Sequence, residues 1–136
     1  MKFFTSFIFL FLSLKSFSIE IKSFKIQYDE KKQNFFLNKD NKTISLIQTN
    51  GGTPRIDRLV SPNENYYLVV YYSGSAGTTS PTYFYDAAVF NKDNEFQGII
   101  PYSVENNKTE FITLQYKQKQ IIVLEDKEIK KKLDVK

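Results

Sequence analysis

The segment Tyr66–Tyr72, with the sequence YYLVVYY, restricts the fold of this chain more than any other feature. It is a continuous run of aromatic, branched and other apolar residues, a composition that is enriched in strands. In an extended chain its odd-numbered and even-numbered positions point to opposite sides. Because both sides are apolar, the run predicts a central strand that is covered on both faces. The alternative is that some of the tyrosines are exposed, as is typical of interaction surfaces.

Similar short apolar segments recur along the chain, separated by Asn, Asp, Gly and Lys. Phe24, Ile26 and Tyr28 alternate with polar residues, which is the period of a half-buried strand. The full set of expected strands is 24–28, 34–37, 43–48, 66–72, 82–91, 95–100, 110–116 and 120–124. About eight strands with turn signals between them predict an all-β fold, a small antiparallel barrel or sandwich.

The tetrapeptide Asn-Lys-Asp-Asn occurs twice, at Asn38–Asn41 and at Asn91–Asn94. Asn and Asp tolerate left-handed backbone and close turns with their own side chains. We interpret both copies as hairpin turns. A calcium loop is the functional alternative, but each copy lacks the central Gly and the distal Glu of an EF-hand.

The N-terminus has the layout of a signal peptide. Lys2 precedes an apolar run, Phe3–Leu14, and Ser16 and Ser18 then occupy the small-residue positions of a cleavage site. A membrane anchor needs about 20 apolar residues, and Lys15 ends this run earlier. We therefore expect residues 1–18 to be cleaved before Ile19. The mature protein is expected to be periplasmic or secreted, with no stable membrane anchor after cleavage.

The C-terminal segment 127–136 is basic, with five Lys against one Glu and one Asp. We place the β domain at 19–126 and a basic C-terminal tail at 127–136. Within this segment Ile129 and Leu133 fit a helix, the spacing to Val135 also fits a strand, and a frayed tail is the third possibility. Because the positive charge of the mature chain is concentrated here and not in the domain, we expect no binding to nucleic acid.

The residues that most often perform catalysis are absent. The chain has no His and no Cys, which removes the commonest general base, metal ligand and thiol nucleophile. Asp86 is the only acid within a strongly apolar strand, and we interpret it as a hydrogen-bonded structural acid. We expect the protein not to be an enzyme and to need no metal or other cofactor.

The segment Ser73–Pro81 is uncharged in a chain that is 25% charged. It lies between the two most aromatic strands, and its Gly residues relax the backbone while Ser and Thr supply hydrogen-bonding groups. It is either a flexible hairpin loop or a probe that enters the cleft of another protein. The candidate partner-binding residues are Ser73, Gly74, Ser75, Gly77, Thr78, Thr79, Tyr83 and Tyr85.

The region 57–90 contains a Ser-Gly-Ser-Ala-Gly loop and a Tyr-x-Tyr-Asp-Ala strand, and it ends at the Phe that begins a Phe-Asn-Lys-Asp turn. In these features it resembles periplasmic lysozyme inhibitors and immunity proteins against secreted cell-wall hydrolases. It differs from them in lacking a Ser-Gly-x-x-Tyr motif and cysteines. The resemblance implies an eight-stranded exported β protein whose loop blocks the cleft of a protein partner, a peptidoglycan hydrolase. The alternatives are a β-barrel carrier of a small apolar ligand and a structural subunit of an envelope assembly.

Overall fold

The computed structural model describes residues 23–48, 50–105 and 112–136. The described residues form ten strands and confirm the predicted all-β, antiparallel class, although about eight strands were expected. The strands are β1 Lys25–Asp29, β2 Asn34–Lys39, β3 Lys42–Ser45, β4 Ile56–Asn63, β5 Tyr66–Ala76, β6 Thr82–Asn91, β7 Phe96–Glu105, β8 Ile112–Lys117, β9 Gln120–Glu125 and β10 Glu128–Asp134. Two strands lie outside the expected set: β4, and β10, for which a strand was one of three possibilities.

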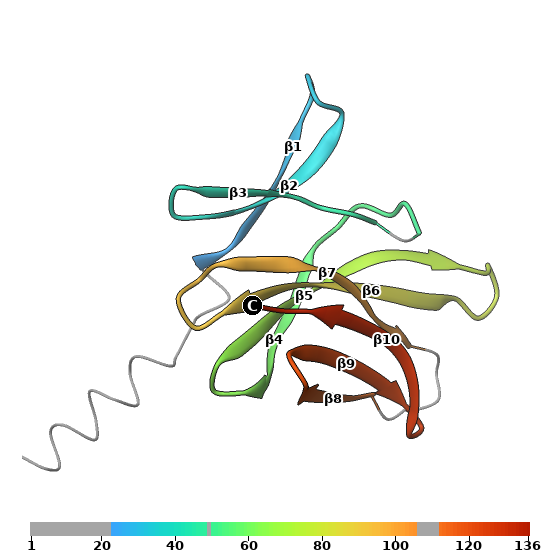
Figure 1. Ribbon diagram of the computed structural model, residues 1–136. Helices are drawn as coiled ribbons and strands as arrows, with labels where there is room; N and C mark the ends of the chain where they lie inside the picture. The colour runs from blue at the N-terminus through green and yellow to red at the C-terminus, as the bar shows by residue number, and fades with distance from the viewer. Residues whose placement is uncertain (1–22, 49, 106–111) are drawn as a thin grey trace, which may run out of the picture.

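The strands form three antiparallel sheets that lie in layers (Figure 1). The central sheet has the order β4-β5-β6-β7, the upper sheet β1-β2-β3, and the lower sheet β10-β9-β8. No strand pairing joins one sheet to another among the described residues. The fold is therefore sandwich-like, and the closed barrel that the sequence left open is not formed by this part of the chain.

Strand β5 is covered on both faces, as its sequence predicts. Tyr67, Val69 and Tyr71 belong to the core that the central sheet shares with the upper sheet. Leu68 and Val70 belong to the core that it shares with the lower sheet. The four residues from Leu68 to Tyr71 are 0% exposed. Two separate cores therefore hold the three layers together, one on each face of the central sheet.

Strand β10 corrects the prediction that residues 127–136 form a tail. It pairs with β9, so that Leu133 lies opposite Ile121. Leu133 packs against the core, and Val135, just beyond the strand, is buried in it. Gly98 permits this approach, because a Cβ there would lie 3.0 Å from a methyl carbon of Leu133. The domain thus continues past residue 126 almost to the C-terminus.

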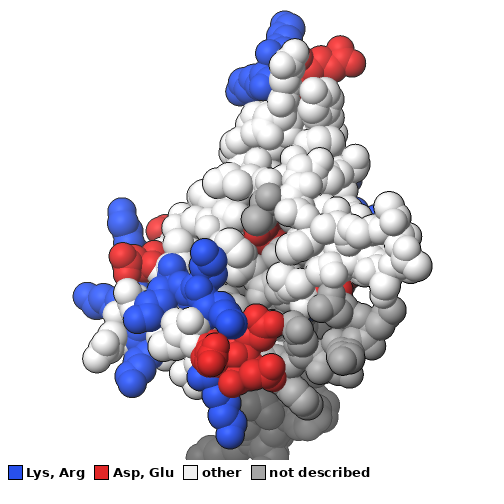
Figure 2. All heavy atoms as spheres, turned by 90° about the vertical axis from the view of Figure 1, so that its right-hand side faces the viewer, with Lys and Arg blue, Asp and Glu red and all other residues white. Residues whose placement is uncertain are grey.

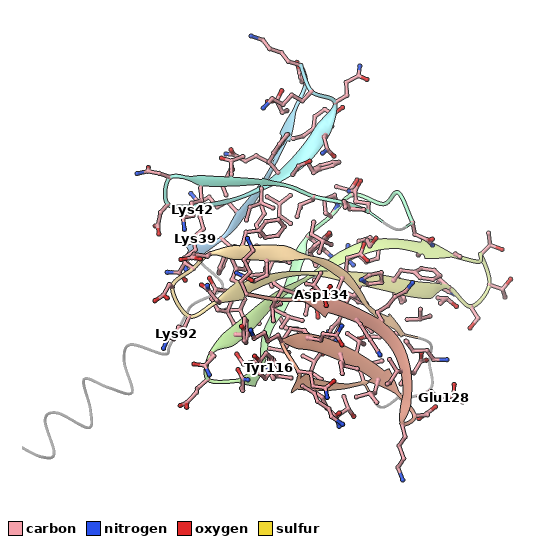
Figure 3. All side chains as sticks on the ribbon, in the orientation of Figure 1. Lys39, Lys42, Lys92, Tyr116, Glu128 and Asp134 are labelled. Carbon is pink, nitrogen blue, oxygen red and sulfur yellow. The ribbon has the colours of Figure 1, made fainter. Side chains whose placement is uncertain are left out.

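Both Asn-Lys-Asp-Asn segments are hairpin turns, as predicted. Asp40 connects β2 to β3 and Asn94 connects β6 to β7, and both have positive φ, 53° and 63°. The two turns also meet (Figure 3). Lys39 and Tyr67 donate hydrogen bonds to the Asn94 side-chain oxygen, at 3.0 and 2.8 Å, and Lys42 donates to its carbonyl at 3.0 Å. We call these three hydrogen bonds to Asn94 the polar clamp. They connect the upper sheet to the central sheet.

The predicted signal peptide, residues 1–18, lies outside the described residues, so cleavage and export stay predictions. Within the described part of the chain, no helix has the length and apolar character needed to cross a membrane.

Candidate functional site

The first two residues of the predicted loop 73–81 belong to strand β5 and are buried. Ser73 is 0% exposed; its Oγ accepts a hydrogen bond from the Asn50 N–H at 3.4 Å, and its carbonyl accepts one from the Gly52 N–H at 2.9 Å. Gly74 is also buried, with φ 141°, and a Cβ there would lie 2.7 Å from Asn50. Ser73 and Gly74 therefore anchor the hairpin, and the loop itself spans only 77–81.

The rest of the segment forms the exposed end of the β5–β6 hairpin, which projects to the right in Figure 1. Ser75, Gly77, Thr78 and Thr79 are all exposed. We call residues 75–80 the hairpin tip. Strand β4 pairs with β5 only as far as Tyr71. The tip therefore extends beyond β4. It is carried by the pairing of β5 with β6, which has a register shift between Tyr72 and Gly74, and β7 pairs with β6 as far as Tyr83.

The face that carries the hairpin has an uneven distribution of charge. Figure 2 views the molecule from the right-hand side of Figure 1, so that the hairpin points toward the reader. Charged side chains gather at the top, on the β1–β2 hairpin, and in the lower half of the view. The area between them is largely uncharged, which agrees with the absence of charged residues from the tip.

A cluster of aromatic and cationic side chains lies at the base of the hairpin. The Arg55 guanidinium lies 4.2 Å from the Tyr72 ring centroid, and the Tyr72 ring is 6.1 Å from Tyr85 and 6.2 Å from Tyr83. The Arg58 guanidinium lies 5.4 Å from the Tyr85 ring. We call these five residues the Tyr–Arg patch. The patch contains Tyr83 and Tyr85, which were predicted site residues, and three residues that were not predicted, Arg55, Arg58 and Tyr72.

The two arginines are the feature of the sequence that could have indicated this patch. Arg55 and Arg58 are the only arginines in a chain with 19 basic residues. Arg is enriched in protein interfaces, whereas Lys is depleted there. Arg55 is distant from Tyr72 in the sequence, and the backbone hydrogen bond that the Tyr72 N–H donates to the Arg55 carbonyl brings the two residues together.

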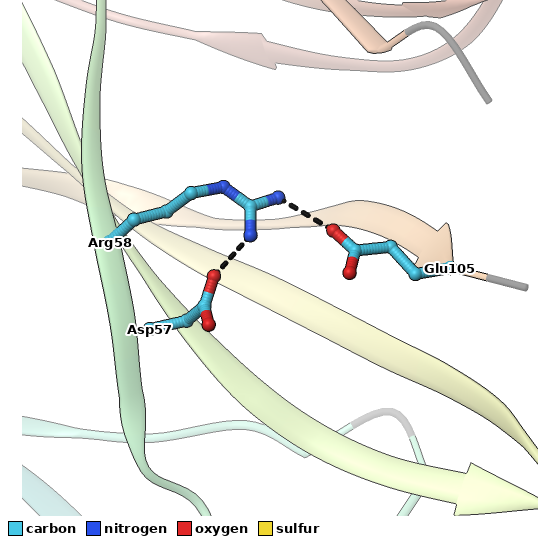
Figure 4. Close-up of polar contacts among 3 residues, drawn as sticks. All are labelled: Asp57, Arg58 and Glu105. Carbon is cyan, nitrogen blue, oxygen red and sulfur yellow. Dashed lines mark hydrogen bonds and ion pairs between the residues drawn. The ribbon is translucent and has the colours of Figure 1, made fainter. Parts of the chain in front are cut away.

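The Arg58 side chain is held by two carboxylates (Figure 4). It forms ion pairs with Asp57 and with Glu105, the latter at 2.9 Å. Burial lowers the pKa of Arg58, but the hydrogen bond that Arg58 donates to Glu105 and the charge of Asp57 raise it overall. Arg55 has no acidic partner among the described residues. Arg58 is thus a fixed part of the patch, whereas the exposed Arg55 retains hydrogen-bond donors.

Tyr85 remains a neutral hydrogen-bond donor at neutral pH. Burial raises its pKa, and the charges of Glu105 and Asp57 raise it further against the opposing effect of the arginines. Its ring also forms part of a second feature, a pocket of about 300 Å³ between the central and lower sheets. The pocket has aromatic and aliphatic walls that include Tyr102, Ile112 and Val123.

No group of three or more acidic side chains that could hold a metal ion occurs in the described ranges. Asp86 is buried in β6, 1% exposed. These observations leave the expected lack of enzymatic activity and of cofactors as predictions. The candidate site is instead a surface for contact, composed of the hairpin tip, the Tyr–Arg patch and the adjacent pocket.

Comparison with known proteins gives no relative. No family model, no curated protein and no solved structure matches this chain. The resemblance to lysozyme inhibitors and immunity proteins therefore stays an expectation.

Proposed function

We propose that this protein is an exported binding module that inhibits a cell-wall hydrolase by placing its hairpin tip in the cleft of the enzyme. The observation that carries the proposal is the combination of an uncharged, fully exposed tip with buried anchors, Ser73 and Gly74, directly behind it. A projecting element of this kind can enter a concave site without deforming the rest of the sandwich.

The chemistry of the tip suits a cleft that contains carboxylates and is shaped for sugar hydroxyls. An acidic tip would be repelled there, and a lysine would have to lose its hydration before pairing. The hydroxyls of Ser75, Thr78 and Thr79 can donate to ionised oxygens, and each such bond contributes about 1.5–3 kcal/mol. The tip thus offers hydroxyl groups in place of those of the substrate.

The Tyr–Arg patch supplies a second contact zone beside the tip. Tyr and Arg are the residues that most often carry the binding energy of protein interfaces. Arg55 stacks on Tyr72 and is exposed, so it can pair with an acid at the rim of the cleft without breaking an ion pair of its own. The tip and the patch together form one continuous binding surface.

Association also costs conformational entropy, which a preformed hairpin reduces. Strand pairing continues to Ala76 opposite Thr82, and Pro81 limits the backbone at the end of the turn. Only a few residues at the turn therefore need to be ordered when a partner binds.

The proposal is tested with the mature chain and a panel of lysozymes and peptidoglycan amidases, in an assay that follows the clearing of a peptidoglycan suspension. We expect inhibition of at least one enzyme. In that complex the triple variant Ser75→Ala, Thr78→Ala, Thr79→Ala should bind more weakly by about 3 kcal/mol or more, with an unchanged melting temperature.

The matched control replaces three exposed hydroxyl residues away from the tip, Thr43→Ala, Ser61→Ala and Thr113→Ala, one in each sheet. This variant should inhibit like the unchanged chain. The proposal is wrong if no hydrolase in the panel is inhibited, or if the tip variant and the control variant inhibit equally well.

A further inference from the structure

A buried hydroxyl without a partner lies in the wall of the pocket between the central and lower sheets. Ser103 is 8% exposed, and its Oγ forms no hydrogen bond with any described residue. It pairs directly with Tyr85 across β6 and β7, so both side chains are on the face of the central sheet that the pocket borders. Such a group is rarely left unsatisfied in a folded protein, which makes it an indication of an external partner.

The size and lining of the pocket favour a mostly apolar occupant. A volume of about 300 Å³ is large enough to hold several waters. The walls include Tyr85, Tyr102, Ile112 and Val123, so most of these waters would find few hydrogen-bond partners. Displacing poorly held water with an apolar group favours binding. A pocket of this volume is at the lower end of the range for small-molecule sites.

The mouth of the pocket carries both signs of charge. Lys131 lies opposite Val123 in the ladder and therefore on the pocket side of the lower sheet, and Glu125 lies on that side opposite Ile112. Lys130, also at the mouth, forms an ion pair with Glu128 at 3.3 Å. Because the charges balance, the mouth gives no general preference for an anion or a cation.

We propose that this pocket binds a small neutral molecule with an apolar, flat body and one hydrogen-bonding group, which pairs with the Ser103 hydroxyl. The flat body lies against the rings of Tyr85 and Tyr102. The site is separate from the hairpin tip and does not depend on inhibition of a hydrolase. It is the site that the alternative function, carriage of a small apolar ligand, would require.

Two fluorescent probes of the same shape test the proposal, naphthol and naphthalene, each titrated with the full chain and with Ser103→Ala. Naphthol should bind the unchanged protein about tenfold more tightly than it binds Ser103→Ala, as expected for one hydrogen bond. Naphthalene, which has no hydroxyl, should bind both proteins equally. Ser61→Ala, which removes an exposed hydroxyl of β4 away from both sites, is the control and should bind both probes like the unchanged chain.

A second variant separates loss of the site from loss of the fold. Ile112→Phe places extra volume in the pocket and should abolish the binding of both probes, while far-ultraviolet circular dichroism stays unchanged. The proposal is overturned if neither probe binds, or if Ser103→Ala weakens naphthol and naphthalene by the same factor. It is also overturned if naphthoate or protonated naphthylmethylamine, the analogues that are charged at neutral pH, binds tenfold more tightly than naphthol.

Discussion

The upper and lower sheets cover the two faces of the central sheet to different extents. On the upper side, buried aromatic rings are sealed by polar contacts: Tyr71 donates a hydrogen bond to the Ile47 carbonyl, and the polar clamp at Asn94 closes the edge. On the lower side, the covering sheet stops short, leaving Tyr83 38% exposed and a pocket beside Tyr85. The same kinds of residue thus form a closed core on one face and an accessible surface on the other.

This difference between the two faces agrees with the positions of the proposed binding sites. Aromatic side chains that serve only the fold are expected to be buried and to have their hydroxyls satisfied. Tyr67 and Tyr71 follow that rule, whereas Tyr83 is partly exposed and the half-buried Tyr72 lies beside the exposed Arg55. The side with the incomplete cover is therefore the side on which both proposed binding sites lie.

The largest expected effect comes from removing one aromatic ring from each face of the central sheet. Phe90 is 1% exposed and stacks on Tyr67 at 5.2 Å. Phe90→Ala should lower the free energy of unfolding by about 3–5 kcal/mol, because it opens a cavity in a closed core. Tyr83→Ala should lower it by less than about 1 kcal/mol, since its ring is already partly in solvent. Urea denaturation measures both changes in the free energy of unfolding. Equal losses would contradict the proposed difference in packing between the two faces.

A second test uses pH to examine the sealed face. Burial raises the pKa of Tyr67 to about 12, and burial also raises the pKa of Tyr71. An unfolded tyrosine ionises near pH 10, so between about pH 10 and 12 the unfolded state loses its proton first and is favoured. The folded state should therefore lose stability as the pH rises through this window.

The variant Tyr67→Phe measures how much of this loss of stability comes from the ionisation of Tyr67. At pH 7 it should cost about 0.5–1.5 kcal/mol through the lost hydrogen bond to Asn94. Thermal denaturation from pH 8 to about 12 should then show a shallower decline for the variant than for the unchanged protein. Tyr85→Phe, on the open face, should flatten the decline less. A decline that is the same with and without the Tyr67 hydroxyl would contradict the expected role of burial at this site.

The sequence was sufficient to predict elements whose local pattern and tertiary environment agree. The two apolar faces of Tyr66–Tyr72 and the two Asn-Lys-Asp-Asn turns are examples, because period and turn chemistry are local properties. Strand β4 was not predicted because it is an edge strand that contains Pro62 and charged residues, which edge strands tolerate. Strand β10 was ambiguous because the spacing of Ile129, Leu133 and Val135 fits a helix and a strand.

The candidate site was predictable only in part, for a related reason. The uncharged tip and the tyrosines of β6 are visible in the sequence as composition. The stacking of Arg55 on Tyr72 depends on the pairing of distant strands, and the pocket at Ser103 depends on where the lower sheet ends. Neither contact leaves a local pattern. Likewise, no feature of the Ser73–Pro81 sequence distinguishes its buried serine from its exposed ones.

The smallest expected effect concerns that last distinction, between Ser73 and Ser75. Ser73→Ala removes a buried hydroxyl that accepts a long hydrogen bond from the Asn50 N–H, so the free energy of unfolding should fall by about 0.5–1 kcal/mol. Ser75→Ala changes an exposed hydroxyl and should have almost no effect on stability. In binding to an inhibited hydrolase the order should reverse, because only Ser75 can reach a partner. If Ser73→Ala weakened binding more than Ser75→Ala while leaving stability unchanged, then the division of the hairpin into buried anchor and exposed tip would be wrong.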